Sequence, residues 1–135
     1  MRVLVDTSVW IEFFRSRPQL SEESLSFLNL LIVDDRVVTI YPIQAELFSG
    51  TISKDRETGI RGAFDAMIHI DLDWNAASTW NELVEKAHKA RKASLPIPGI
   101  VDRMILAAAE KGETSLWTLD RPLKRLAEEI GVRLF

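Results

Sequence analysis

The sequence of 135 residues contains no cysteine, which excludes disulfide bonds, thiolate metal sites and cysteine nucleophiles. It has only two histidines, His69 and His88, and neither has a histidine neighbour at the spacing of a metal-ligand pair. No apolar run approaches the roughly 20 residues that a membrane span needs. An acidic residue, Asp6, comes too early for a signal peptide. We therefore expect a soluble protein of the cytoplasm with no membrane partner.

Glycine-rich phosphate-binding motifs are also missing. Neither G-x-G-x-x-G nor G-x-x-x-x-G-K occurs, which disfavours the common nucleotide-binding enzymes. The formal net charge of −3 argues against a general nucleic-acid coat. One segment, 86–92, is nevertheless densely basic. Taken alone, such a segment is more typical of a solvated helix face than of a binding surface.

Short apolar segments alternate with helical patterns along the whole chain. Strands are predicted over Arg2–Val5, Val37–Ile40, Ile68–Leu72, Ser115–Thr118 and Val132–Leu134. Helices are predicted over Ser8–Arg15, Ser21–Val33, Pro42–Thr51, Asp55–Met67, Asn75–Ala93, Ile100–Lys111 and Pro122–Ile130. This alternation predicts a three-layer α/β/α sandwich around a parallel sheet of about five strands. Because no repeat or long linker divides the sequence, residues 1–135 are expected to form a single domain.

Four acids lie where a predicted strand or loop leads into a helix: Asp6, Glu46, Asp102 and Asp120. The carboxyl ends of parallel strands share one edge of a sheet, so we expect these side chains to meet there. Two unit charges 4 Å apart repel by about 4 kcal/mol near a protein surface, which favours a cation among them. Oxygen ligands select Mg²⁺ or Mn²⁺ rather than zinc, and such an ion suits phosphodiester hydrolysis by activated water.

Each acid taken singly also has a purely structural explanation. Asp6 and Asp120 are well placed to cap helices, and Asp102 suits the positive end of a helix. Glu46, one turn into a helix, is typical of a surface residue. Only their joint placement at one sheet edge favours a metal site.

These acids and their neighbours resemble the motifs of the PIN-domain family, and within it those of the VapC-type toxins of toxin–antitoxin pairs. The resemblance runs nearly end to end. Its motifs are Val5-Asp6-Thr7-Ser8-Val9-Trp10, then Ala45-Glu46-Leu47 with Gly50, then Asp102-Arg103-Met104-Ile105-Leu106-Ala107-Ala108-Ala109 with Gly112, and finally Thr118-Leu119-Asp120.

The resemblance implies a PIN-like fold and a Mg²⁺- or Mn²⁺-dependent endoribonuclease that acts as the toxin of such a pair. It implies an antitoxin partner, an RNA substrate and a homodimer. It makes Asp6 and Asp102 the principal metal ligands, with Glu46 and Asp120 completing the site directly or through water. Candidates for orienting these carboxylates through hydrogen bonds are Thr7, Ser8 and Thr118.

The resemblance also strengthens the case for the basic segment, which ends just before the loop that leads to Asp102. Lysine and arginine side chains there could guide an RNA backbone toward the metal, which gives affinity without sequence specificity. The candidate RNA-binding residues are Lys86, Lys89, Arg91, Lys92, Arg103 and Arg121.

Two other functions remain as alternatives. A phosphoryl-receiver signalling module has the same general fold class, but Asp6 lacks an adjacent second acid and the last strand has no lysine. A catalytically silent domain that binds RNA or protein is the other alternative. The presence of all four acids argues against it.

Overall fold

The computed structural model describes all 135 residues and contains one parallel sheet of four strands. The strands are β1 (Val3–Val5), β2 (Val37–Thr39), β3 (Ile68–His69) and β4 (Ser115–Trp117), in the order β3-β2-β1-β4. Leu4 of the central strand β1 lies opposite Val38 on one side and Leu116 on the other. All three residues of β1 are fully buried, as expected for a parallel strand that is covered on both faces.

The sheet has four strands rather than the expected five, because the segment Val132–Leu134 forms only a single bridge. Leu134 pairs with Leu116, and the Leu116 amide donates to the carbonyl of Arg133 at 2.8 Å. The predicted strand at Ile68–Leu72 is also shorter than expected. It ends at His69 because its neighbour β2 ends at Thr39, where the next helix begins.

Seven α-helices occupy the predicted regions with small changes at their ends. They are α1 (Thr7–Phe14), α2 (Glu22–Val33), α3 (Tyr41–Glu46), α4 (Lys54–Asp65), α5 (Ala77–Lys92), α6 (Ile100–Gly112) and α7 (Arg121–Ile130). The expected helix Pro42–Thr51 is divided: α3 ends at Glu46 and continues as a π-helical turn, η1 (Leu47–Thr51). None of these helices has the length and hydropathy of a membrane span.

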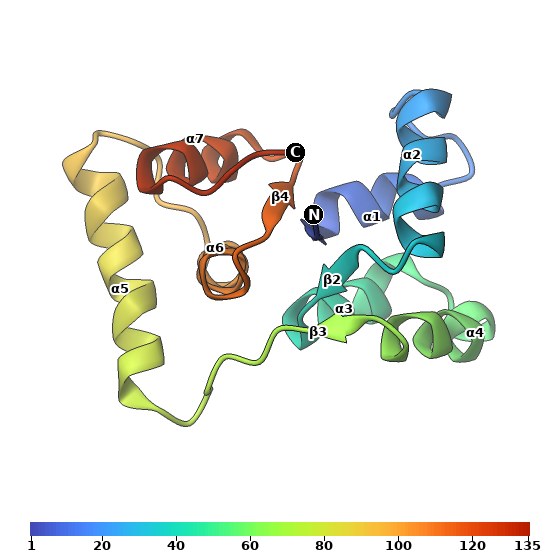
Figure 1. Ribbon diagram of the computed structural model, residues 1–135, viewed down its shortest axis with the longest axis horizontal. Helices are drawn as coiled ribbons and strands as arrows, with labels where there is room; N and C mark the ends of the chain where they lie inside the picture. The colour runs from blue at the N-terminus through green and yellow to red at the C-terminus, as the bar shows by residue number, and fades with distance from the viewer.

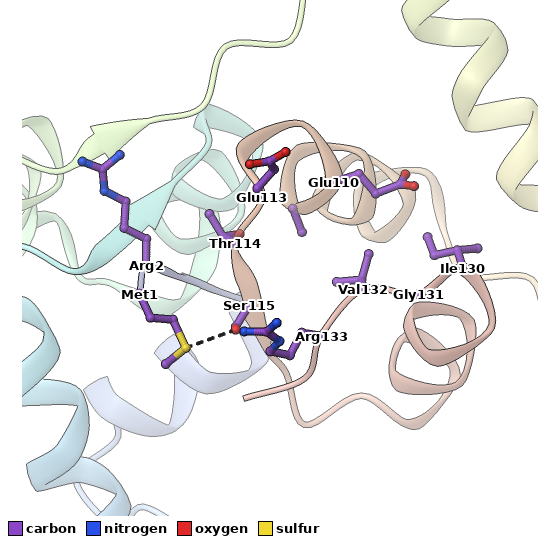
Figure 2. A pocket seen from close by; sticks show the side chains of 11 residues that line it. Met1, Arg2, Glu110, Glu113, Thr114, Ser115, Ile130, Gly131, Val132 and Arg133 are labelled. Atoms are coloured by element: carbon purple, nitrogen blue, oxygen red, sulfur yellow. Dashed lines mark hydrogen bonds between the residues drawn. The ribbon is translucent and has the colours of Figure 1, made fainter.

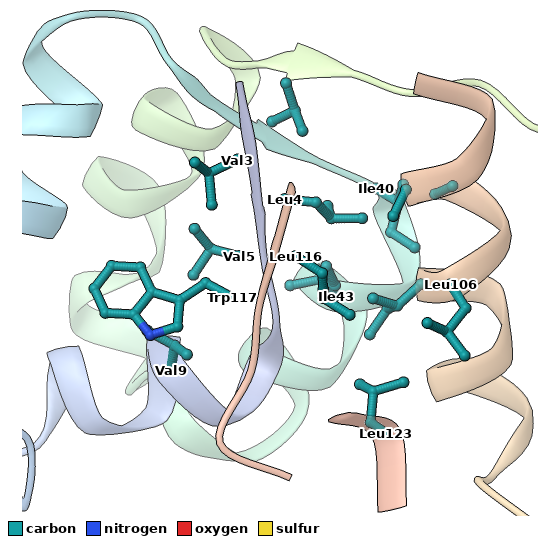
Figure 3. Close-up of a cluster of buried hydrophobic side chains, with 14 of the residues drawn as sticks. Val3, Leu4, Val5, Val9, Ile40, Ile43, Leu106, Leu116, Trp117 and Leu123 are labelled. Atoms are coloured by element: carbon teal, nitrogen blue, oxygen red, sulfur yellow. The ribbon is translucent and has the colours of Figure 1, made fainter. Parts of the chain in front are cut away.

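The helices cover both faces of the sheet, which confirms the three-layer α/β/α architecture. Helices α5, α6 and α7 gather on one side of the strands, and α1, α2 and α4 gather on the other (Figure 1). Side chains alternate along the strands: Val3 and Val5 face one layer, whereas Leu4 and Leu116 face the other, toward Leu106 of α6 (Figure 3). These residues belong to a single hydrophobic core of 28 buried side chains.

Helix α6 ends at Gly112, and the left-handed position falls on the next residue, Glu113, with φ of 52°. Gly112 itself lies close to a neighbouring side chain. A β-carbon at this position would lie 2.6 Å from the terminal methyl carbon of Ile70. The absence of a side chain therefore lets α6 pack closely against the segment that follows β3.

The positive φ of Glu113 leads to a stability prediction. Glu113→Gly is expected to raise the free energy of unfolding by up to about 1 kcal/mol, because glycine adopts the left-handed conformation without steric cost. Urea denaturation is the measurement. Glu128→Gly, within α7, is the matched control and should destabilise by about 1 kcal/mol. A loss of stability in both variants would contradict the prediction.

Candidate active site

Asp6 is the buried centre of the site. It directly follows β1 and caps α1, and its residue is only 3% exposed. Its carboxylate accepts three hydrogen bonds, each of 2.7 Å, from the Thr7 amide, the Ser8 hydroxyl and the Thr118 hydroxyl. Burying a charge is costly unless hydrogen bonds compensate for lost water. The three donors supply that compensation and hold the carboxylate in one orientation.

The hydroxyl groups of Ser8 and Thr118 also connect Asp6 with the segment that carries Asp120. The Thr118 hydroxyl accepts a hydrogen bond from the Asp120 amide at 3.1 Å, and the Ser8 hydroxyl accepts one from the Leu119 amide at 3.0 Å. Asp120 itself caps α7, since its carboxylate accepts from the Leu123 amide at 2.9 Å. The capping explanation is thus correct for both Asp6 and Asp120, but it accounts for only part of the arrangement.

Glu46 reaches the site from the junction between α3 and η1. Although its side chain is exposed, its carboxylate accepts a hydrogen bond of 2.8 Å from the hydroxyl of Thr7. The π-helical turn that follows closes with a bond of 3.0 Å from the Ile52 amide to the Leu47 carbonyl. Such turns are frequent at functional sites. The π-helical turn has no signal in the sequence that would have predicted it.

Asp102 lies in the first turn of α6, and its pKa reports its surroundings. The pKa is raised from 3.8 to about 6, first by burial and then by the negative charges of Asp6, Asp120 and Glu46. Like charges nearby favour the protonated carboxyl. Asp6 and Asp120 follow the carboxyl ends of β1 and β4. Hydrogen bonds through Thr118 and Thr7 connect the segment of Asp6 with Asp120 and Glu46. Asp102 lies close enough to all three acids for their charges to act on it.

The geometry of the acids limits how they could hold a divalent cation. No three of these acids form a ready ligand set. Charges act over several ångströms, whereas a Mg²⁺–oxygen bond is only about 2.0–2.1 Å long, so acids can repel each other without converging on one point. Mg²⁺ commonly uses one or two carboxylates and completes its octahedron with water and phosphate. The all-oxygen donor set and its concentrated negative charge fit an ion held in this way.

Two of the basic candidates have structural partners. Lys86 is only 6% exposed, and its ammonium group lies 2.5 Å from a carboxylate oxygen of Glu110, which joins α5 to α6. The expectation that Lys86 belongs to an exposed basic surface is therefore wrong. The guanidinium of Arg103 donates to the carbonyls of Pro98 and Leu83, both at 3.0 Å, and so fixes the loop that precedes α6.

The other basic candidates are exposed to solvent. Lys89, Arg91 and Lys92 lie in the last turns of α5, and Arg121 directly follows Asp120 at the start of α7. None of these four forms an ion pair within the chain. They remain free to contact a phosphate backbone.

A separate hollow of about 510 Å³ lies at the opposite, amino edge of the strands (Figure 2). Both positive and negative side chains line it, among them Arg2, Arg133, Glu110 and Glu113. It contains none of the sequence-predicted site residues. The acids therefore lie apart from this hollow, at the other end of the strands.

Comparison with known proteins identifies the family of this fold and acid arrangement. Residues 3–129 match the PIN domain. The chain belongs to the PIN-domain family. No curated protein matches this PIN domain by sequence.

Solved structures share the fold of this PIN domain at low sequence identity. One is FitAcB from Neisseria gonorrhoeae, with 19% identity and a TM-score of 0.68, covering 98% of this chain and 96% of that one. Another is VapBC2 from Rickettsia felis, bound to a DNA fragment from its promoter. There the identity is 17% and the TM-score 0.66, covering 100% of this chain and 98% of that one.

Proposed function

We propose that this PIN domain is a Mg²⁺- or Mn²⁺-dependent endoribonuclease that acts in the cytoplasm as the toxin of a toxin–antitoxin pair. The observation that carries the proposal is the gathering of four acids at one sheet edge, where Asp102 responds to the charges of the other three. Membership of the PIN family supports it and removes the phosphoryl-receiver alternative.

In the proposed site Asp6 and Asp102 hold the ion, and Glu46 and Asp120 complete its surroundings directly or through water. The bound ion would supply an activated water and neutralise charge on the phosphate. Ser8 and Thr118 keep the Asp6 carboxylate turned toward the site. The hydroxyl of Thr7 positions Glu46 in the same way. Such supporting hydrogen bonds commonly determine how well a ligand carboxylate works.

We assign binding of the RNA backbone to the exposed cations Lys89, Arg91, Lys92 and Arg121. Arg103 acts by fixing the loop before Asp102, and Lys86 is left out because it is buried and paired. Phosphate contacts of this kind provide affinity without reading the sequence, and they weaken as salt concentration rises.

The assignment of an antitoxin and of a homodimer follows from the resemblance to VapC-type toxins. Helix α2 supports the presence of a protein partner, because Phe27, Leu30 and Val33 recur every three residues and remain 44%, 58% and 77% exposed. Contiguous apolar surface of this kind is typical of protein-binding faces.

An RNA cleavage assay tests the proposed function. Single-stranded RNA should be cut in Mg²⁺ or Mn²⁺, and EDTA should abolish cutting reversibly. Hydrolysis by water should leave 5′-phosphate and 3′-hydroxyl ends. Products with 2′,3′-cyclic phosphates would contradict the mechanism. RNA binding without any scission would instead identify a catalytically silent domain.

A further inference from the structure

An aromatic pair lies at the same edge of the sheet as the acids and has no role in the proposed chemistry. Tyr41 is the first residue of α3 and is 65% exposed. Its ring lies against that of His69, with centroids 4.6 Å apart and planes tilted by 31°. One face of the phenol is thus supported by the imidazole, while much of the side chain remains open to solvent.

Hydrogen bonds on both ring nitrogens fix the imidazole of His69. Its Nδ1 lies 2.9 Å from the carbonyl of Met67, and its Nε2 lies 2.8 Å from the side-chain nitrogen of Gln44. A carbonyl can only accept, so Nδ1 donates to Met67. Gln44 is itself buried, at 5% exposed. The imidazole is therefore held in place on both sides before any ligand arrives.

The strand order places this pair beside the acids. Tyr41 follows the end of β2, which is the direct neighbour of the β1 strand that leads to Asp6. His69 ends β3, one strand further away, so strand spacing puts it about 10 Å from β1. Glu46 lies five positions after Tyr41 in α3, a rise of about 7.5 Å along the helix axis. Tyr41 and Glu46 thus stand at the two ends of one short helix beside the acids.

The charge of the site determines which part of an RNA can bind there. The acids repel phosphate groups, so charged contacts close to them are unfavourable in the absence of metal. A flat, neutral aromatic surface attracts a nucleobase without this penalty, and every base has a face that can stack. Base stacking on an aromatic side chain is also largely independent of sequence.

We propose that Tyr41, supported by His69, is a stacking platform for a nucleobase next to the RNA bond that is cut. The inference rests on the proposed function for its substrate class. Tyr41 provides the contact surface, and His69 is a positioning residue that keeps the phenol ring in place.

The test measures binding of labelled single-stranded RNA by fluorescence anisotropy, in EDTA so that metal-dependent scission is absent. Tyr41→Ala should weaken binding about tenfold or more, whereas Tyr41→Phe and Tyr41→Trp should remain within about twofold of the wild type. Trp80→Ala removes another exposed aromatic ring, in the first half of α5, and should leave RNA binding unchanged. Tyr41 is mostly exposed, so its replacement should not prevent folding, which circular dichroism can verify.

A second probe separates base stacking from backbone contacts. An abasic ribose-phosphate oligomer of the same length should bind the wild type and Tyr41→Ala equally, because neither complex has a base to stack. Unchanged RNA binding by Tyr41→Ala, or an equal loss in Tyr41→Phe, would overturn the platform.

The platform and the proposed nuclease fail in distinguishable ways. Normal cleavage with no effect of Tyr41→Ala overturns the platform alone. No scission in Mg²⁺, together with tenfold weaker RNA binding by Tyr41→Ala, supports the platform and overturns the nuclease. A wild-type protein that binds no RNA in EDTA and cuts none in Mg²⁺ overturns both.

Discussion

Replacing Asp102 by asparagine is expected to slow Mg²⁺-dependent RNA cleavage at least about a hundredfold. The amide keeps the shape of the side chain but removes a charge that, in the proposed site, helps to hold the ion, and such an ion commonly supplies several kcal/mol of transition-state stabilisation. Initial rates of RNA cleavage are the measurement. Asp65→Asn removes an exposed carboxylate at the end of α4 and should leave the rate unchanged.

The same substitution should stabilise the metal-free protein at neutral pH. In the folded state the pKa of Asp102 is about 6, above its ordinary 3.8, so folding favours the protonated carboxyl. The stability that this group contributes is complete below about pH 4 and is lost as pH rises through 6. The difference in unfolding free energy between Asp102→Asn and the wild type, both in EDTA, should therefore grow between pH 4 and pH 7.

Two observations would contradict this account of Asp102. One is rapid cleavage by Asp102→Asn, which would show that the carboxylate is not needed for the chemistry. The other is a stability difference that stays constant with pH, which would show that neither burial nor the other three acids raise the pKa of this group. Urea denaturation at several pH values provides the second measurement.

Trp10→Ala is expected to cost about 3–5 kcal/mol of unfolding free energy, a large part of the roughly 5–15 kcal/mol typical of a domain. Trp10 is only 1% exposed, and its ring lies 5.0 Å from that of Phe64, between centroids. Phe13 and Phe14 pack against the same indole at 5.7 and 5.9 Å. Alanine would leave a cavity where α1 contacts α4. Urea denaturation at neutral pH measures the loss.

The matched variant Trp10→Phe should be much less destabilising. The indole Nε1 of Trp10 is buried without a hydrogen-bond partner, which carries a free-energy cost that phenylalanine does not have. Phenylalanine also keeps an aromatic ring among Phe13, Phe14 and Phe64. Equal destabilisation by both substitutions would show that the lost ring contacts are not the main cause.

Two of the acids, Asp6 and Asp120, could be placed at the sheet edge from the sequence because each follows a simple local signal. Asp6 comes directly after an apolar strand, and Asp120 precedes the Arg121-Pro122 start of a helix. Parallel strands then force their carboxyl ends to one edge, whatever the details of packing. The number of helices and the α/β/α layering followed from the same periodic patterns.

Features that depend on tertiary contacts could not be predicted in this way. Lys86 belongs to a basic segment, but its burial depends on the position of Glu110 on another helix. The missing fifth strand depends on how little of the 132–134 segment pairs with β4. The pair of Tyr41 and His69 joins residues 28 positions apart, and only the register of β2 and β3 brings them together. The sequence gives only one indication that Tyr41 lies near the site: it comes directly after a predicted strand.

The hydrogen bond from Thr118 to Asp6 spans 112 positions of the chain and has a consequence for protein synthesis. Translation proceeds from the amino terminus, so Asp6 emerges from the ribosome long before its partner exists. A nascent polypeptide that stops short of β4 has neither the threonine that fixes this carboxylate nor Asp120. The proposed site can therefore form only after β4 and the residues that follow it have been made.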